Sequence, residues 1–198
     1  MKPIVLIHGA WHGPWCWDDV AADLRRRGHE VEAVTLPGHD HPGDHRRIWN
    51  RISQYIEAVA EAASSLDEPP VLVGHSMGGY TVQRYLEEHT AAAGVLVASV
   101  PWRGSLRPNL RAIRRRPGPT VLAALTADYS RMVANADLVH ELFFTPETPR
   151  EIVASTVERL QNESALAINA MAFRRIRTGR ITTPMHVIGA AGDAVFSV

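Results

Sequence analysis

Short apolar runs alternate with amphipathic stretches through the first hundred residues of the chain. Continuous apolar runs such as Ile4–Ile7 are typical of strands that are buried on both faces. The stretches between them carry apolar positions at i, i+3, i+4 and i+7, which is the spacing of one helix face. The pattern predicts strands at 4–7, 31–34, 70–73 and 94–98, and helices at 18–27, 48–66 and 81–88.

The alternation stops after residue 101 and resumes near the end of the chain. Residues 102–178 show helical patterns without a convincing strand, and residues 184–189 restore the strand pattern. Within this block we expect three helices: one capped by Asp128, one opened by a capping box that starts at Thr148, and one at 163–173. A helical block inserted between strands at the ligand end of a sheet indicates a lid.

Strands that alternate with helices predict an α/β fold, with a mostly parallel, doubly wound sheet and helices on both faces. We divide the chain into a first core part (1–101), a helical lid (102–178) and a resumed core part (179–198). The resumed part is short, so we expect the last strand and the last helix of the core to be missing from this sequence.

Composition narrows the class of protein. The 198 residues have a formal net charge of zero and 45% hydrophobic side chains, which predicts one globular domain without a bias toward nucleic acid or membranes. No stretch reaches the roughly 18 apolar residues of a membrane span. Cys16 is the only cysteine, so an internal disulfide is excluded and a cytoplasmic location is expected. The oligomeric state stays open, with a homodimer as the alternative to a monomer.

The sequence Gly74-His75-Ser76-Met77-Gly78 carries the strongest chemical signal. It follows a predicted strand and precedes a predicted helix, which is the setting of a nucleophile elbow. A turn this sharp crowds the backbone, so small residues must flank it, and Ser76 is left exposed at the apex. The amide of Met77 then lies at a helix N-terminus, where positive partial charge collects.

A loop rich in glycine and aromatic residues (8–17) follows the first predicted strand. Open α/β sheets place their ligand sites at the carboxyl ends of strands, so this loop is a candidate for substrate binding. Trp11 and Trp102 come directly after strand ends, and we expect both at the rim of a substrate pocket. Trp17 lies on the apolar face of the next predicted helix and is assigned to the core.

These motifs resemble those of the α/β-hydrolase superfamily. The opening motif His-Gly-Ala-x-His-Gly-x-Trp-x-Trp of its small cap-bearing esterases and hydroxynitrile lyases is similar to His8-Gly9-Ala10-Trp11-His12-Gly13-Pro14-Trp15-Cys16-Trp17. The elbow and the sequence Leu36-Pro37-Gly38-His39 also resemble the family pattern, whereas the lid resembles it only weakly.

The resemblance implies a catalytic site without cofactor or metal, which acts on a small-molecule ester. Ser76 would be the nucleophile, and the backbone amides of Ala10 and Met77 would form the oxyanion hole. Asp193 would be the acid of a triad, because it follows the strand after the lid in a Gly-x-x-Asp context. The residues assigned to the substrate pocket are Gly9, Trp11 and Trp102.

The family's catalytic histidine follows the acid, but no histidine follows Asp193 in this sequence. Two other histidines are poor substitutes, since His186 lies inside a predicted strand and His75 flanks the nucleophile. His8 and His12 belong to the first loop, where we expect them to fix its conformation through hydrogen bonds. We therefore expect the 198 residues to be part of a longer chain whose remainder carries the base.

Two polar clusters suggest other chemistry. His39-Asp40-His41-Pro42-Gly43-Asp44-His45 brings imidazoles and carboxylates together as a zinc or iron site would need, but its spacing departs from the metallo-hydrolase motif. A solvated polar loop is the default interpretation. The basic cluster Arg111, Arg114, Arg115 and Arg116 could meet an anionic substrate, although a solvated face of a lid helix is the usual explanation.

Three functions remain open at this point. The first is a serine hydrolase that cleaves small carboxylic esters through a Ser-His-Asp triad and an acyl-enzyme. The second is a lyase that cleaves cyanohydrins; lyases of that branch usually carry threonine at the position of Gly9, which favours the esterase. The third is a ligand-binding protein without catalysis, against which the intact elbow at Ser76 argues.

Overall fold

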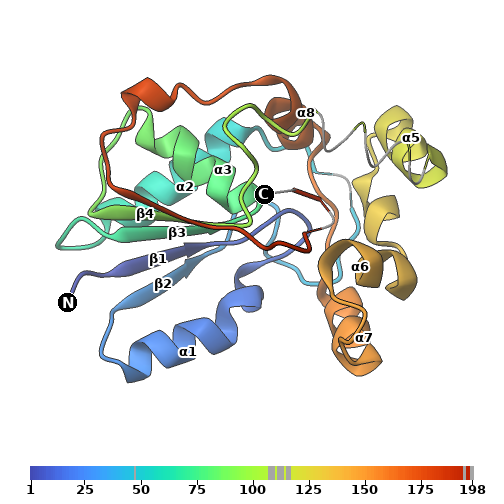
Figure 1. Cartoon of the computed structure of the whole chain (residues 1–198), viewed down its shortest axis with the longest axis horizontal. Coiled ribbons are helices and arrows are strands. Elements are labelled where there is room, and N and C mark those ends of the chain that lie inside the picture. Colours follow the sequence, from blue (N-terminus) through green and yellow to red (C-terminus); the bar gives the residue numbers. More distant parts are fainter. Residues whose placement is uncertain (47, 107–109, 111–113, 115–116, 194, 197–198) are drawn as a thin grey trace.

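A five-stranded parallel sheet forms the centre of the protein (Figure 1). The computed structural model describes residues 1–198 except 47, 107–109, 111–113, 115–116, 194 and 197–198. The strand order is β2-β1-β3-β4-β5, and each neighbouring pair runs parallel. The strands are β1 (Ile4–Ile7), β2 (Val31–Val34), β3 (Val71–His75), β4 (Ala93–Val97) and β5 (Met185–Ile188).

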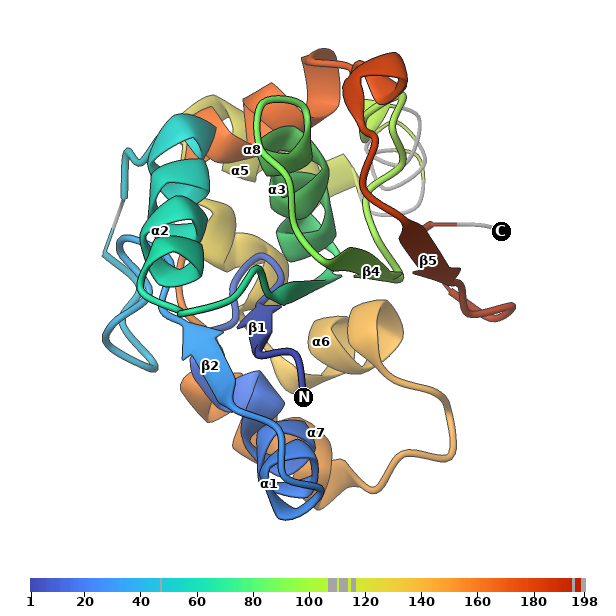
Figure 2. The same cartoon turned by 90° about the vertical axis from the view of Figure 1, so that its left-hand side faces the viewer.

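Helices cover both faces of this sheet. The helix α1 (Asp18–Arg26) lies on one face, and the helices α2 (Ile52–Ser64) and α3 (Met77–Leu86) lie on the other (Figures 1 and 2). A parallel sheet sandwiched between helices is the doubly wound α/β arrangement that the sequence predicts, and the prediction of the fold class is confirmed.

The side chains of β1 alternate between two hydrophobic cores. Val5 and Ile7 pack on the side of α2 and α3, whereas Ile4 and Leu6 pack with Trp17 on the side of α1. Successive side chains of a strand point to opposite faces, so a strand covered on both faces needs apolar residues at every position. This burial explains the unbroken apolar run with which the chain begins.

A helical insertion (residues 98–184) separates β4 from β5. Its helices gather beyond the carboxyl ends of the strands (Figure 1). A small core around Val139 and Val153 packs against Trp11 and Trp15 of the first loop. The described elements of the insertion are α5 (Pro117–Thr126), η2 (Tyr129–Val133), α6 (Ala136–Phe143), α7 (Arg150–Arg159), α8 (Ala165–Phe173) and η3 (Thr178–Arg180).

The helix α2 starts later than the hydrophobic pattern predicts. Its first residue is Ile52 rather than Ile48. The carbonyl of Asn50 accepts a hydrogen bond from the hydroxyl of Ser164 at 2.6 Å, so a tertiary contact uses a backbone group that a longer helix would have needed. Ile48 is buried all the same, which explains why it fits the apolar stripe of the helix without belonging to it.

Two predicted helix caps in the insertion are wrong. Pro149 rather than Thr148 is the N-cap of α7, and no side-chain hydrogen bond caps that helix. Asp128 precedes η2 without capping it, because its carboxylate accepts a hydrogen bond from the hydroxyl of Ser130 instead. The next helix, α6, is a separate element and is capped by the side chain of Asn135.

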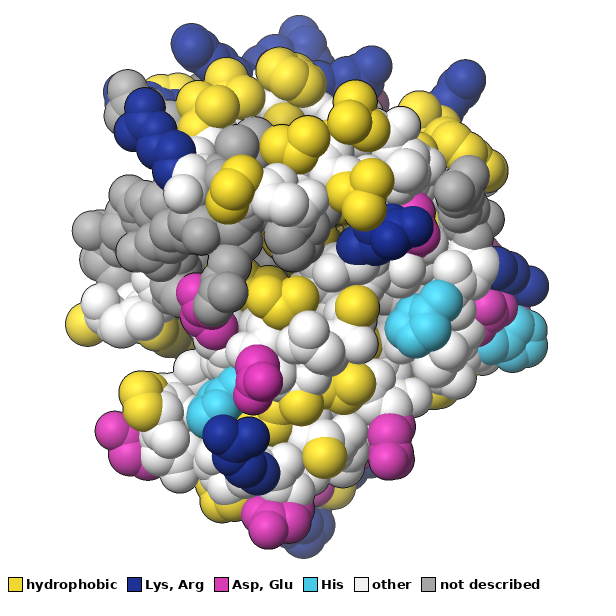
Figure 3. Space-filling model, turned by 90° about the vertical axis from the view of Figure 1, so that its right-hand side faces the viewer, with side chains coloured by type: hydrophobic (Ala, Val, Ile, Leu, Met, Phe, Trp, Pro, Cys, Tyr) yellow, Lys and Arg dark blue, Asp and Glu magenta, His cyan; other side chains and the backbone are white. Residues whose placement is uncertain are grey.

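Figure 3 shows the face on which the insertion lies. Hydrophobic, basic and acidic side chains are interspersed over the described part of this face. Of the predicted basic cluster, Arg111, Arg115 and Arg116 lie outside the described residues, and Arg114 is exposed. None of the described helices is long and apolar enough to cross a lipid bilayer.

Candidate active site

The backbone of Ser76 is strained at the turn between β3 and α3. Its φ is +51° and its ψ is −114°, a conformation that costs a non-glycine residue on the order of 1–3 kcal/mol. Glycines make the turn sterically feasible, since a Cβ on Gly74 would lie 2.5 Å from the Gly78 backbone. A Cβ on Gly78 would lie 2.2 Å from the carbonyl of Ile7. The turn therefore has the geometry of a nucleophile elbow.

The amides of Ala10 and Met77 are candidates for an oxyanion hole. Met77 is the first residue of α3, where backbone amides lack an intrahelical acceptor and positive partial charge collects. Ala10 lies in the loop after β1. Neither amide donates a hydrogen bond to another described residue, and both residues line one cavity together with Ser76. Both amides are thus available to an oxygen atom of a ligand.

Two histidines fix the loop that carries Ala10. The Nδ1 of His8 donates to the Gly9 carbonyl at 2.9 Å, and its Nε2 accepts the Leu36 amide at 3.3 Å. The Nδ1 of His12 donates to the carbonyl of Ala10 at 2.8 Å. The loop-fixing role expected from the sequence is confirmed for both. Burial lowers the pKa of His8 well below its ordinary value and the pKa of His12 to about 4, so both rings are neutral at pH 7.

Asp193 lies in the turn after β5 and lines the same cavity. Its Oδ1 accepts the amides of Val195 and Phe196 at 2.7 and 2.9 Å. Its Oδ2 has no hydrogen-bond donor among the described residues. The carboxylate also acts on His75: burial lowers the pKa of that ring, and the charge of Asp193 opposes the shift in part. One carboxylate oxygen is therefore held by the backbone while the other stays unpaired.

Four loops at the carboxyl ends of β1, β3, β4 and β5 meet the insertion around a cavity of about 460 Å³. Apart from two neutral histidine rings its described lining is mostly apolar, and Asp193 is its one charged residue. The described residues that line it are Gly9, Ala10, Trp11, His12, His75, Ser76, Met77, Ala98, Val100, Ser105, Leu142, Phe143, Phe144, Thr145, Ile168, Met171, Ala190, Gly192, Asp193, Val195 and Phe196.

The structure places two of the three predicted pocket residues at this cavity. Gly9 and Trp11 line it, whereas Trp102 does not belong to its described lining. The side chain of Trp102 is 44% exposed, and the guanidinium of Arg103 lies 4.6 Å from its ring centroid. The prediction for Trp102 is corrected, because the turn after β4 carries this ring into solvent, where an arginine covers it.

No described histidine links Ser76, the candidate nucleophile, to Asp193, the candidate acid, through hydrogen bonds. His12 and His75 line the cavity, but no hydrogen bond joins either described ring to the hydroxyl of Ser76 or to the carboxylate of Asp193. His186 lies in β5 and is exposed. The assignment of the base therefore stays a prediction.

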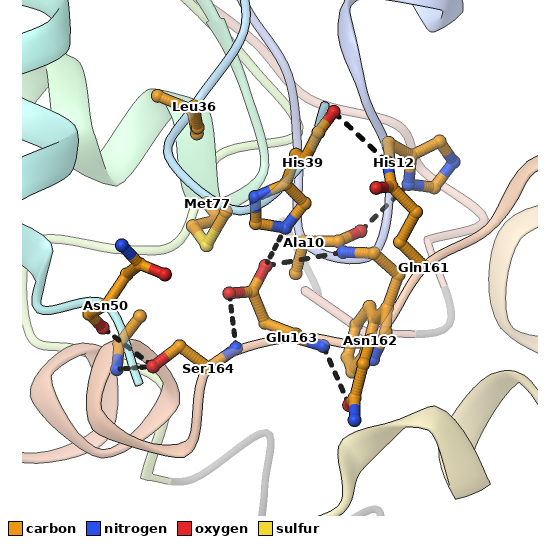
Figure 4. A network of polar contacts seen from close by, with 12 residues as sticks. Ala10, His12, Leu36, His39, Asn50, Met77, Gln161, Asn162, Glu163 and Ser164 are labelled. Carbon is orange, nitrogen blue, oxygen red and sulfur yellow. Dashed lines mark hydrogen bonds and ion pairs between the residues drawn. The ribbon is translucent and has the colours of Figure 1, made fainter. Parts of the chain in front are cut away.

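A buried polar network behind the first loop was missed by sequence analysis (Figure 4). The Nε2 of His39 lies 3.1 Å from the carboxylate of Glu163, which also accepts the hydroxyl of Tyr55 at 2.8 Å. The sequence signal was the polar run 161–164 between the apolar residues Leu160 and Ala165. A polar run of this kind usually indicates solvent exposure, so burial was not foreseeable from the pattern.

No three described histidine, cysteine, aspartate or glutamate side chains come together as metal ligands. In the polar loop 39–45, the outer residues Asp40 and His41 are exposed and lie 3.2 Å apart. The solvated-loop interpretation holds for these residues. It is wrong for His39, which turns inward and is buried against Glu163.

The comparison with protein-family models gives one match across nearly the whole chain. Residues 4–197 match the alpha/beta hydrolase family. The chain belongs to this family. In this α/β hydrolase the sheet is parallel and the strained Ser76 lies at the end of β3, as the resemblance of the motifs to the family predicts.

Relatives of this α/β hydrolase include plant esterases. Methyl jasmonate esterase 1 of Vitis vinifera is 39% identical over 98 residues, which cover 48% of this chain and 38% of that protein. Methylesterase 3 of Arabidopsis thaliana is 44% identical over 84 residues, which cover 40% of this chain and 31% of that protein. The matched part is thus well under half of each relative.

Solved structures extend the likeness to the whole fold. Polyneuridine aldehyde esterase superposes with a TM-score of 0.67 over 100% of this chain and 83% of its own, at 20% identity. A pyrethroid hydrolase from Sphingobium faniae JZ-2 superposes with a TM-score of 0.62 over 98% of this chain and 90% of its own, also at 20% identity. At this level of identity the likeness concerns the fold.

Proposed function

We propose that this α/β hydrolase cleaves small carboxylic esters with Ser76 as its nucleophile. The observation that carries the proposal is the strained backbone of Ser76, with φ at +51°, at the edge of an apolar cavity. Ala10 and Met77, whose amides donate to no other described residue, line the same cavity. The names of the esterase relatives support the same reaction.

In the proposed reaction the hydroxyl oxygen of Ser76 attacks the carbonyl carbon of the ester. The alcohol leaves with a proton, and water then hydrolyses the acyl-enzyme to release the acid. Negative charge develops on the carbonyl oxygen in both steps, and the amides of Ala10 and Met77 would stabilise it. Loss of one such donor costs about 100–1000-fold in rate.

We further propose that the base is a histidine from sequence outside these 198 residues. A serine hydroxyl is a weak nucleophile at neutral pH and needs a base within hydrogen-bond reach. The Oδ2 of Asp193, which accepts from no described residue, suits the ring N–H of such a histidine, while Oδ1 is held by backbone amides. An intact mass that matches only these residues, together with full esterase activity, would contradict this part of the proposal.

The cavity favours uncharged and fairly apolar esters. Its volume of about 460 Å³ lies at the lower end of small-molecule pockets, which span roughly 300–1,000 Å³. The insertion contributes Phe143, Ile168 and Met171 to the wall, and no lysine or arginine belongs to the described lining. The carboxylate of Asp193 would repel the acid product and so favour its release. The proposal uses no cofactor and no metal.

The structure gives one observation against the lyase alternative. A Cβ on Gly9 would lie 2.9 Å from the Nδ1 of His75 and 3.2 Å from the Cβ of Ser76. The threonine that lyases of the resembling branch usually carry at this position would therefore require His75 to move. Assays with p-nitrophenyl esters and with mandelonitrile distinguish the two reactions, and the esterase proposal expects turnover of the esters alone.

A fluorophosphonate probe tests the proposed nucleophile in the full-length protein. We expect the probe to label Ser76, because phosphonylation needs an activated serine, and Ser76→Ala should abolish the labelling. Ser99→Ala is the matched control, since this serine lies outside the described cavity lining and its hydroxyl donates to the Val100 carbonyl. Equal labelling of wild type and Ser76→Ala would exclude Ser76 as the nucleophile, and no labelling of wild type would favour a ligand-binding protein.

Location and assembly are part of the proposal as well. We propose a cytoplasmic location because Cys16 is the only cysteine and cannot form a disulfide within the chain. Disulfides are rare in proteins of reducing compartments such as the cytoplasm. A homodimer is the assembly to test against a monomer, by sedimentation of the purified protein.

A further inference from the structure

Glu163 is a fully buried carboxylate for which the proposed reaction has no use. It lies in the segment before α8, beside the loop that carries Ala10 (Figure 4), and it is not among the described residues that line the cavity. Burying a carboxylate is costly unless it is paired and hydrogen-bonded, so a buried glutamate needs a site built around it. The contacts of this side chain show such a site.

Each carboxylate oxygen of Glu163 has two partners. Oε1 accepts the hydroxyl of Tyr55 at 2.8 Å and the amide of Ser164 at 2.7 Å. Oε2 lies 3.1 Å from the Nε2 of His39 and accepts the amide of Trp11 at 3.4 Å. Four groups from four separate parts of the chain thus fix the carboxylate, and one of them belongs to the loop that carries the proposed oxyanion donor.

Hydrogen bonds fix two successive peptide groups of the loop that carries Ala10. In a trans peptide the carbonyl and the N–H point in opposite directions. The Gly9 carbonyl is bound by the ring of His8, so the Ala10 amide of the same peptide points away from that ring. The next peptide is fixed at both ends, because His12 binds the Ala10 carbonyl and Glu163 binds the Trp11 amide.

The loop needs this support, since Trp11 has a φ of +64°, which is unfavourable for a bulky residue. Further hydrogen bonds from the same segment and from η2 hold it: the Gln161 amide donates to the Trp11 carbonyl at 2.8 Å, and the Trp11 Nε1 donates to the Tyr129 carbonyl at 3.0 Å. The polar segment 161–164 therefore sets the shape of the oxyanion loop from behind.

We propose that Glu163 is a positioning residue, which fixes the Ala10 amide toward the cavity by holding the amide of Trp11. The inference rests on the proposed function, because it assumes that the Ala10 amide meets the oxyanion. The charge of Glu163 would oppose a developing oxyanion if it stood alone. Burial by itself lowers the pKa of His39, but the Glu163 carboxylate and hydrogen bonds to backbone groups together raise it above its ordinary value, which favours a positive ring beside the negative carboxylate.

Glu163→Gln is the decisive variant. The variant preserves the shape of the side chain. In wild type each carboxylate oxygen accepts from two donors, whereas in glutamine one of the two positions is an NH₂ group, whose hydrogens would face the donors on that side. We expect kcat on p-nitrophenyl esters to fall by about tenfold or more, with KM within about twofold, because the affected donor acts in the transition state. We also expect exchange of the Trp11 amide proton, followed by NMR, to quicken by about tenfold or more.

Glu87→Gln is the matched control. Glu87 is also a buried carboxylate with a backbone amide partner, that of Arg177, but it lies at the end of α3 and outside the described lining of the cavity. Its variant should lose stability and leave kcat and the exchange of the Trp11 amide within about twofold of wild type. If Glu163→Gln does not fold, Tyr55→Phe removes one donor to the same carboxylate and should show the same effects in weaker form.

The outcomes separate this inference from the proposed function. Wild type that hydrolyses esters, with equal kcat in Glu163→Gln and Glu87→Gln, would overturn the positioning role. An unchanged exchange rate of the Trp11 amide in Glu163→Gln would overturn it as well. Wild type without hydrolysis or Ser76 labelling would instead overturn the proposed function, and the exchange rates would still decide whether Glu163 holds the loop.

Discussion

At position 78 the protein has room for a hydrogen atom and nothing larger. A Cβ there would lie 2.2 Å from the carbonyl oxygen of Ile7 and 2.6 Å from that of His8, which are both backbone atoms and cannot rotate away. This close approach brings α3 onto β1 and places Ser76 beside the loop that holds Ala10. The proposed nucleophile and its proposed oxyanion donors are therefore positioned by a contact between backbones.

Gly78→Ala tests this contact. We expect the free energy of unfolding to fall by about 3 kcal/mol, because the helix must move away from the strand. Fluorophosphonate labelling of Ser76 should slow in the folded fraction. Gly179→Ala is the control, since a Cβ at Gly179 would meet nothing within 4 Å and should change the unfolding free energy by less than about 0.5 kcal/mol. Equal urea midpoints for both variants would contradict the prediction.

The lowered pKa of His12 predicts that the free energy of unfolding falls in acid. Burial lowers its pKa in the folded protein from 6.5 to about 4, so between these values the unfolded chain binds a proton that the folded chain does not. The unfolding free energy therefore falls as the pH drops from 6.5 toward 4, by about 1.4 kcal/mol per pH unit for this one group. Urea titrations across this range measure the slope.

His12→Asn should reduce that slope, because asparagine can still donate to the Ala10 carbonyl but does not titrate. The control is His41→Asn, whose side chain is 63% exposed in wild type and whose replacement should leave the slope unchanged. A slope in His12→Asn equal to that of wild type would show that the ring does not become protonated on unfolding in this range.

Residues differ in how well the sequence predicts their conformation and burial. The sharp turn at Ser76 was predictable because its motif, the strand before it and the helix after it all require one backbone shape. His39 and Glu163 were not, because they are 124 residues apart and nothing in either neighbourhood indicates burial. Trp102 was misassigned for a related reason: its position after a strand is visible in the sequence, but the direction of the following turn is not.

At the scale of elements, the segment 161–164 joins the insertion to the rest of the fold. All four of its side chains are buried although all are polar. Asn162 shows why: its Nδ2 donates to the His45 carbonyl and to Asp128, both at 3.2 Å, and its Oδ1 accepts the Glu163 amide at 2.8 Å. One side chain thereby connects the polar loop, the turn before η2 and the start of α8.

Asn162→Ala should loosen the insertion. The variant leaves the buried amide of Glu163 without its acceptor, and we expect the free energy of unfolding to fall by about 2–3 kcal/mol. Limited proteolysis should cut within residues 117–160 sooner than in wild type. Ser155→Ala, on the exposed side of α7, is the control and should behave like wild type. Unchanged protection of the insertion in Asn162→Ala would contradict the connecting role of this side chain.

Helices and strands were predictable to different degrees. The strand β1 was found because burial on both faces leaves an unbroken apolar run. The start of α2 was misplaced because a tertiary contact decides it: the hydroxyl of Ser164 takes the carbonyl of Asn50. The helix α7 begins at Arg150, one residue later than predicted, with Pro149 as its N-cap. Helix ends depend on which partners reach the terminal amides and carbonyls, and the local pattern does not contain that information.

At the scale of the whole molecule, the chain must return from the insertion to the sheet. Glu87, at the end of α3, holds the returning segment against this helix. Its carboxylate accepts hydrogen bonds from the amide and the guanidinium of Arg177 and also pairs with Arg84. The hydroxyl of Tyr80 on the same helix donates to the Arg174 carbonyl at 2.9 Å. These contacts hold the chain that leads to β5 against the first half of the fold.

The adjacent residues Glu87 and Glu88 allow a matched test of this closure. Both pair with Arg177, but the side chain of Glu87 is 1% exposed and that of Glu88 is 66% exposed. Glu87→Ala should lower the free energy of unfolding by about 3–5 kcal/mol, since it leaves buried charge uncompensated. Glu88→Ala should change it by less than about 1 kcal/mol, because solvent screens the pair. Similar losses in both variants, measured by urea unfolding, would contradict the closing role of Glu87.

The overall architecture was predictable because local patterns and chain order point to one arrangement: apolar runs separated by amphipathic helices give a parallel sheet. The cavity was predictable only in part. The loops after β1, β3 and β5 carry recognisable motifs, whereas the contributions of the insertion, such as Phe143 and Met171, depend on how helices without a distinctive sequence dock against the sheet.

A crystal structure of the full-length protein after reaction with a fluorophosphonate tests the central claim most directly. The account predicts a phosphonyl group on Ser76 Oγ, with its oxygen at about 2.7–3.1 Å from the backbone nitrogens of both Ala10 and Met77. An adduct on another residue, or a phosphonyl oxygen that points away from these two amides, would contradict it.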